Sequence, residues 1–91
     1  MLTGRRYVVS GSVQGVGFRF FVRDAAFREG IRGWVRNRED GRVEIEAEGD
    51  AEALLRFETA VRRGPAGARV DDVSVDPLAA GGTRHDFVIE H

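Results

Sequence analysis

Apolar residues recur along the first third of the chain with two different periods. Residues 7–13 are rich in valine and lead into a glycine-rich stretch, which predicts a β-strand that runs into a loop. From residue 18 onwards, apolar side chains fall at i, i+3, i+4, i+7 and i+8, namely Phe18, Phe21, Val22, Ala25 and Ala26. This spacing predicts an amphipathic helix that lies on a core and ends at Gly30.

A hairpin is predicted next. Residues 33–38 predict one strand, residues 39–41 (Glu-Asp-Gly) a tight turn, and residues 42–48 a returning strand. In the returning strand, apolar and acidic residues alternate strictly, with Val43, Ile45 and Ala47 between Glu44, Glu46 and Glu48. Because successive side chains of a strand point to opposite faces, we expect the apolar side to face a core and the glutamates to face water.

The second half of the chain repeats these signals. Asp50 is suited to cap a helix whose apolar stripe is Leu54, Phe57 and Val61, and Gly64-Pro65 ends it. Residues 70–75 and 87–89 predict later strands, joined by a loop that contains Pro77 and Gly81-Gly82. The order of elements predicts an α+β fold, a ferredoxin-like βαββαβ sandwich. Its mainly antiparallel sheet has four or five strands, with two helices on one face.

Length and composition limit what this fold can do. A chain of 91 residues, 42% of them hydrophobic, predicts a single domain, residues 1–91. The sequence contains no cysteine, which excludes a disulfide framework, a thiolate metal site and a cysteine nucleophile. His91 is the last residue, so a zinc, iron or copper site would have to be built from His85 and carboxylates, which are poor ligands for such a site.

The basic residues are unusual in kind and in distribution. All 14 are arginines, which excludes lysine Schiff-base chemistry and a Walker A loop. Residues 1–42 hold nine arginines against four acids, a net charge of +5, whereas residues 43–91 hold five arginines against eleven acids, a net charge of −6. Such a chain can attract a small anion to one region while repelling a long polyanion. We therefore expect a small anionic ligand and no nucleic acid.

The sequence gives no sign of a membrane segment. No apolar run approaches the roughly 18 residues of a transmembrane helix, and residues 1–6 lack the apolar stretch of a signal peptide. We expect a cytoplasmic protein that does not bind membranes. Nothing in the sequence requires assembly, so we expect a monomer.

The loop between the first strand and the first helix has the composition of an anion site. Its glycines can turn successive backbone N–H groups inward, and the helix N-terminus adds about half a positive charge. The candidate cradle is the backbone of Gln14, Gly15, Val16, Gly17, Phe18 and Arg19. The alternative is that the glycines serve only a tight turn. A dinucleotide fingerprint is excluded, because Phe20 stands where its third glycine is needed.

Two polar side chains favour the anion site. Arg19 lies in the first turn of the helix, where the helix dipole destabilises a cation by roughly 0.3–1 kcal/mol. This cost is avoided if Arg19 and the N–H groups of the helix start bind the same anion. For Arg23, Arg28 and Arg32 we expect the ordinary exposure of surface arginines to solvent. By strand parity Asn37 points its amide toward the helix side, where it needs a partner. It can hold a water there, or it can stabilise the turn that follows, and its position alone does not distinguish the two roles.

These residues lie in two stretches that resemble a known family. Residues 11–19 (GSVQGVGFR) resemble the first signature of acylphosphatases. Residues 33–37 (GWVRN) resemble the second, with Gly41, Val43 and Gly49 following at the expected spacing. Ser12 departs from the basic residue that many members have there, which affects a peripheral charge and leaves the cradle intact.

The resemblance implies a small hydrolase that cleaves acyl phosphates to a carboxylate and inorganic phosphate without metal or cofactor. It implies that Arg19 binds the phosphate, that Asn37 positions the water, and that the backbone of residues 14–19 forms the oxyanion cradle. The leaving carboxylate is a weak base whose conjugate acid has a pKa near ~4, so no general acid is needed. Inorganic phosphate is then both a product and a competitive inhibitor.

Two other functions fit the same order of elements. RNA-recognition motifs share it, but Glu44, Glu46 and Glu48 on the open face would repel an RNA backbone. The second alternative keeps the cradle for binding only, or for carbamoyl phosphate, as in the acylphosphatase-like domain of large hydrogenase-maturation proteins. Turnover of a small acyl phosphate distinguishes this alternative from the hydrolase.

Overall fold

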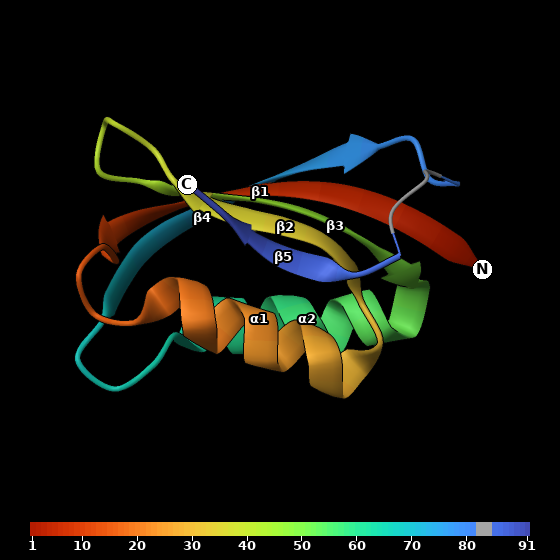
Figure 1. The fold of residues 1–91 in the computed structure, drawn as a ribbon, viewed down its shortest axis with the longest axis horizontal. Helices are drawn as coiled ribbons and strands as arrows, with labels where there is room; N and C mark the ends of the chain where they lie inside the picture. The colour runs from red at the N-terminus through yellow and green to blue at the C-terminus, as the bar shows by residue number, and fades with distance from the viewer. Residues whose placement is uncertain (82–84) are drawn as a thin grey trace.

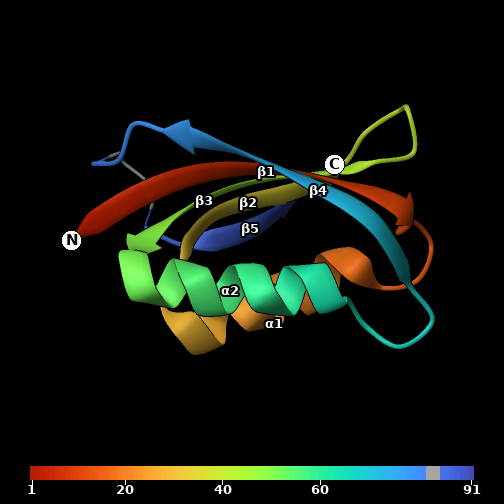
Figure 2. The same cartoon turned by 180° about the vertical axis from the view of Figure 1, so that it is seen from behind.

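The computed structural model describes residues 1–81 and 85–91, and within them five strands and two helices form two layers. In chain order these are β1 (Leu2–Ser12), α1 (Phe18–Glu29), β2 (Arg32–Asn37), β3 (Val43–Asp50), α2 (Ala51–Arg63), β4 (Arg69–Leu78) and β5 (Phe87–Glu90). The sheet order is β4-β1-β3-β2-β5, in which β2 and β5 are parallel and the other neighbours are antiparallel. Both helices cover one face of the sheet (Figures 1 and 2). The predicted ferredoxin-like sandwich is confirmed, with five strands.

The core lies between the sheet and the helices, at the positions that the periodicities predicted. Phe18, Val22, Ala25 and Ala26 of α1 are buried, as are Leu54, Phe57 and Val61 of α2. The ring of Phe57 lies edge-on between Tyr7 and Phe87, with ring centroids 5.9 and 6.0 Å away. Gly30 ends α1 in a left-handed conformation, and the Asp50 carboxylate accepts a hydrogen bond from the Glu52 N–H at the start of α2. Both predicted caps are confirmed.

Two boundaries differ from prediction at the sheet edges. The first strand begins at Leu2 rather than at residue 7, because its polar first residues pair with the end of β3 from Leu2↔Asp50 onward. Pro77 was expected in a loop, but it lies within β4, opposite Arg5. An edge strand tolerates proline, since its missing N–H can face away from the neighbouring strand. Gly82 lies outside the described residues.

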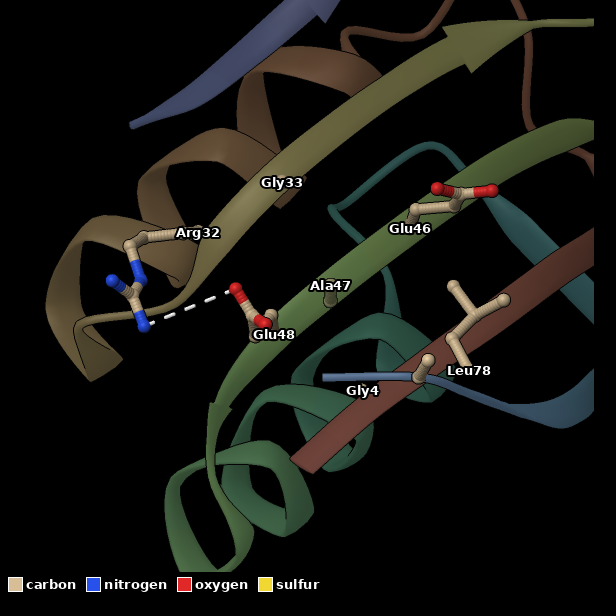
Figure 3. A pocket seen from close by; sticks show the side chains of 8 residues that line it. Gly4, Arg32, Gly33, Glu46, Ala47, Glu48 and Leu78 are labelled. Carbon is tan, nitrogen blue, oxygen red and sulfur yellow. Dashed lines mark ion pairs between the residues drawn. The ribbon is translucent and has the colours of Figure 1, made fainter. Parts of the chain in front are cut away.

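The sheet face opposite the helices is not the open acidic surface that the alternation predicted. Glu44 and Glu48 are only 4% and 7% exposed. Arg6 and Arg36 contact the Glu44 carboxylate at 2.6 and 2.8 Å, and Figure 3 shows the Glu48 carboxylate directed at Arg32, 3.9 Å away. The alternating pattern predicts the face of the sheet on which each glutamate lies. It does not predict which arginines of the neighbouring strands lie beside that glutamate. Glu44 and Glu48 are therefore not the exposed acidic residues that were expected to repel an RNA backbone.

Candidate active site

The loop that follows β1 adopts the conformation of an anion cradle. Gly15 and Gly17 have φ angles of 75° and 76°, whereas Val16 between them has a negative φ. Alternation of left-handed and right-handed residues turns successive N–H groups toward one side of the chain. A Cβ atom at either glycine would meet nothing within 4 Å. The backbone conformation, and not a lack of space, therefore requires glycine at both positions.

The N-terminus of α1 adds its own donors to this loop. Gly17 is the N-cap residue, no side chain caps the helix, and the first turn contains no acidic residue. The first N–H groups of a helix have no partner within the helix, and the dipole places positive charge at this end. An uncapped helix start that follows two left-handed glycines can hold a phosphate or a carboxylate.

A hollow of about 80 Å³ opens at this point, and we refer to it as the α1 hollow. A single water needs only about 10–15 Å³, so the α1 hollow has room for a larger ligand. It is lined by Val13, Gly15, Gly17, Phe18, Arg19, Phe20 and Asn37. The fold thus brings Arg19 and Asn37, from different elements, into one site. Of the other predicted cradle residues, Val16 packs against the core, and Gln14 points its side chain toward the β2–β3 hairpin.

Arg19 has no partner among the described residues that would explain its place. Its side chain is half-buried and forms no ion pair or hydrogen bond with the residues that the structure describes. The helix dipole opposes its charge. A guanidinium that lines a hollow between backbone N–H groups, without a carboxylate to neutralise it, leaves a bidentate donor available to an oxyanion.

Asn37 lines the same hollow and has a buried acceptor that is unpaired among the described residues. Its Oδ1 atom is buried and has no hydrogen-bond partner within residues 1–81 and 85–91. The following turn is held by other groups: Asp40 accepts a hydrogen bond from the Arg42 N–H at 3.0 Å, and the Arg38 N–H donates to the Arg42 carbonyl at 2.8 Å. The hydrogen bonds that Asp40 accepts from the Arg42 backbone N–H and from the Arg42 guanidinium lower the pKa of Asp40. The hydrogen bonds of this turn thus involve Asp40, Arg38 and Arg42, whereas a buried amide oxygen such as that of Asn37 ordinarily needs a water or a ligand as its partner.

Gln14 has a function that the sequence did not reveal. Its Nε2 atom donates hydrogen bonds to the carbonyl oxygens of Arg38 and Arg42, at 2.7 and 3.0 Å. The side chain joins the glycine-rich loop to the hairpin that follows Asn37. Within the loop, Gln14 has the long amide donor that can span such a gap, and this was the signal available from the sequence.

Sequence reasoning also missed a set of aromatic residues on the outer side of α1. Phe20 and Phe27 are spaced by i, i+7 and remain 54% and 60% exposed. The guanidinium of Arg23 stacks between them, 5.2 and 5.9 Å from the two ring centroids. Arg23 is therefore not a freely solvated arginine as expected, whereas Arg28 is exposed and Arg32 lies beside Glu48.

Two further observations complete the description of the site and its setting. In residues 1–81 and 85–91, no three histidine or carboxylate side chains gather as a metal site would require. Neither helix of this part of the chain has the length and hydropathy needed to cross a membrane.

Known proteins resemble this chain in sequence and in structure. A family model described as Acylphosphatase matches residues 5–89. A Bacillus subtilis acylphosphatase is 48% identical over 84 residues, which cover 92% of each chain, and one from Koribacter versatilis is 49% identical over 86 residues, 94% of this chain and 78% of that one. The crystal structure of acylphosphatase from Bacillus subtilis superposes with a TM-score of 0.94 at 46% identity, over 100% of both chains. A crystal structure of full-length HypF in its phosphate- and nucleotide-bound form matches with a TM-score of 0.91 at 29% identity, over 100% of this chain and 12% of that one.

Proposed function

The chain belongs to the acylphosphatase family, whose function is the hydrolysis of acyl phosphates, and we propose that it performs this reaction in the α1 hollow without a metal ion. The single observation that supports this location best is Arg19, a half-buried cation at an uncapped helix N-terminus that has no partner within residues 1–81 and 85–91. The reaction is the attack of water on the phosphorus of a carboxyl–phosphate anhydride. It releases a carboxylate and inorganic phosphate.

The phosphate end of the substrate binds first in this scheme. The backbone N–H groups of Gly15, Gly17, Phe18 and Arg19 donate to its oxygens, and the Arg19 guanidinium holds two of them as a fork. In phosphoryl transfer, negative charge spreads over the three equatorial oxygens in the transition state. Donors fixed by the loop before the substrate arrives stabilise that charge without having to reorganise.

Asn37 orients the nucleophile. Its buried Oδ1 accepts a hydrogen bond from a water molecule. This hydrogen bond directs a lone pair of the water oxygen at the phosphorus atom. The water oxygen forms the new P–O bond while the bond to the acyl oxygen breaks, and the electron pair leaves with the carboxylate. The proton of the water passes to a phosphate oxygen of the substrate. The carboxylate leaves as a weak base, so the reaction needs no general acid.

We also propose a biological setting, that of a cytoplasmic monomer. Residues 1–91 are proposed to act as one domain, because the core is continuous across all elements described. Size-exclusion chromatography with light scattering tests the oligomeric state. A mass of two chains would show the monomer proposal to be wrong.

The experiment that tests the function is hydrolysis of benzoyl phosphate by the purified protein, with and without a chelator. We expect turnover that the chelator does not change. Turnover that the chelator abolishes would contradict the metal-free mechanism, and no turnover with tight phosphate binding would favour a binding-only module. The similarity to full-length HypF keeps that second candidate in view, so carbamoyl phosphate belongs in the same assay.

A further inference from the structure

The outer side of α1 carries an aromatic stripe that the core does not use. Phe20 and Phe27 are more than half exposed, and Arg23 stacks its guanidinium on both rings. The Nε atom of Arg23 is buried and has no hydrogen-bond partner in the part of the chain that the structure describes. Two exposed phenylalanines that share one arginine are a costly arrangement for a surface that only faces water.

This stripe forms one wall of a groove of about 470 Å³, which we refer to as the aromatic groove. Its walls are Phe20, Arg23 and Phe27 from α1 and Phe87, Val88 and Ile89 from β5. At Phe27 it meets a second hollow of about 380 Å³, which extends toward Gly30 and Ile31. Seven residues separate the two exposed rings, so the stripe runs for about 10 Å along the helix. Figure 1 shows β5 at the edge of the sheet, above α1.

The aromatic groove begins at the site proposed above. Phe20 lines both the groove and the α1 hollow, so the two spaces share a wall. Asn37 likewise lines a separate polar hollow, whose other lining residues are Arg6, Arg36, Arg38, Glu39, Glu44 and His91. His91 also lines the aromatic groove, so the polar hollow and the aromatic groove adjoin there. The α1 hollow thus has one apolar neighbour, reached at Phe20, and one polar neighbour, reached at Asn37.

We propose that the aromatic groove binds the acyl half of the substrate and that it selects acyl phosphates with aromatic or other apolar acyl groups. The inference rests on the proposed function. In phosphoryl transfer the attacking and leaving oxygens lie roughly in line, on opposite sides of phosphorus. If Asn37 holds the water, the polar hollow is on the water's side of the phosphate. The acyl group then leaves by the other neighbour, along Phe20.

The charges in the groove agree with an uncharged occupant. Arg23 is its basic side chain, Asp86 is an acid in the same lining, and His91 lies at one end. The Arg23 guanidinium lies 5.2 and 5.9 Å from the centroids of the two rings, and beside it the groove presents aromatic surface and β5 side chains to a ligand. Aromatic pairs gain about 0.5–1.5 kcal/mol beyond the burial of their area. Each ring is thus expected to change the preference for an aromatic over a small acyl group by a factor of about 2 to 12.

The test compares three substrates: acetyl phosphate, benzoyl phosphate and succinyl phosphate, which adds a carboxylate to the acyl group. The variants are Phe20→Ala, Phe27→Ala and the double variant, with Leu55→Ala as the control. Leu55 is equally exposed, at 55%, but lies on α2, away from the groove. The quantity measured is the ratio of kcat/KM for benzoyl phosphate to that for acetyl phosphate. Denaturation midpoints confirm that each variant is folded, and Phe20→Leu replaces Phe20→Ala if that variant is unstable.

We expect the natural protein to prefer benzoyl phosphate over acetyl and succinyl phosphate. The ratio should fall about 3- to 10-fold in each single variant and further in the double variant, while Leu55→Ala leaves it unchanged. Turnover of both substrates with a ratio that does not respond to Phe20 or Phe27 would overturn the acyl subsite and leave the proposed function standing. A preference for succinyl phosphate would place the acyl group in the polar hollow instead. Failure to hydrolyse any of the three would contradict the proposed function itself.

Discussion

The side-chain amide of Gln14 donates a hydrogen bond of 2.7 Å to the carbonyl oxygen of Arg38, the residue that follows Asn37. A second bond from the same nitrogen reaches the Arg42 carbonyl at 3.0 Å. Gln14 thereby joins the glycine-rich loop to the hairpin. Arg19 and Asn37 belong to separate elements, so we expect this bridge to help hold their relative position.

Removal of the bridge should impair turnover more than stability. A net hydrogen bond contributes about 0.5–1.5 kcal/mol, so we expect Gln14→Ala to lower the free energy of unfolding by about 1–2 kcal/mol. A displacement of about 1 Å in an active site can cost roughly 100-fold in rate, so we expect kcat to fall by about 10- to 100-fold. Thr59→Ala is the control, since it removes a hydroxyl that donates to the Leu55 carbonyl on α2. Equal activity in the two variants would mean that Gln14 has only a structural role.

Arg19 should be needed for both binding and turnover. Arg19→Ala removes the cation that neutralises the phosphoryl oxygens, and we expect a rate loss on the order of 10³-fold or more together with weaker phosphate binding. Arg19→Lys should restore little, because a point charge cannot replace the fork of the guanidinium. Arg28→Ala, at the exposed opposite end of α1, is the matched control. Near-normal activity in either Arg19 variant would move the site away from this loop.

Local features of the site could be predicted from the sequence, whereas contacts between distant segments could not. The spacing of Gly15, Gly17 and Arg19 determines a loop and a helix start, which is local information. The burial of Glu44 depends on Arg6 and Arg36, which are 38 and 8 residues away and meet it only through the strand register. The alternation of residues within β3 cannot predict which residues of the neighbouring strands lie beside Glu44.

The same locality explains the other residues that were missed. The bridge from Gln14 spans 24 residues to Arg38, and the aromatic groove needs β5 to lie beside α1. The i, i+7 spacing of Phe20 and Phe27 is present in the sequence. It indicates a separate exposed stripe only once the structure shows that the buried stripe of α1 faces away from these two residues. Burial, not hydrophobicity, identified the second stripe.

Glu44 should make the free energy of unfolding depend on pH in the acidic range. Burial would raise the pKa of Glu44, but hydrogen bonds from Arg36 and Arg6, with their charges, outweigh it and hold the pKa below its ordinary value of 4.5. A group with a lowered pKa in the folded state stabilises fully above its unfolded pKa and loses that stabilisation as the pH falls through its folded pKa. We expect the denaturation midpoint to drop below about pH 4.5, and less steeply in Glu44→Gln. Asp24→Asn, at an exposed position on α1, is the control, and identical pH profiles for Glu44→Gln and the natural protein would contradict this role.

Inorganic phosphate should compete with the substrate, because product and transferred group occupy one cradle. A phosphate titration at several benzoyl phosphate concentrations is expected to raise the apparent KM and leave the maximal rate unchanged. A fall in maximal rate without a change in KM would mean that phosphate binds elsewhere. Arg19→Ala should weaken this inhibition, and Arg28→Ala should not.

Replacement of Asn37 should abolish turnover without weakening the binding of phosphate. The Oδ1 atom of Asn37 has no hydrogen-bond partner in the described part of the chain, so Asn37→Ala loses no hydrogen bond there through that atom. We expect a denaturation midpoint close to that of the natural protein. If the amide holds the attacking water, the variant loses nearly all turnover and keeps its affinity for inorganic phosphate. Asp40→Ala provides the opposite case, because Asp40 accepts the hydrogen bonds that hold the turn. It should lower the midpoint and change turnover only modestly.

Three measurements on both variants decide between the two roles of Asn37: phosphate affinity by calorimetry, turnover of benzoyl phosphate, and the denaturation midpoint. A turn residue would make Asn37→Ala behave like Asp40→Ala, with a stability loss of about 1 kcal/mol and near-normal turnover. A phosphate ligand would make it behave like Arg19→Ala, with both affinity and turnover lost. Only the water-positioning role predicts lost turnover together with native affinity and native stability, because the water contributes to the transition state and not to the binding of phosphate.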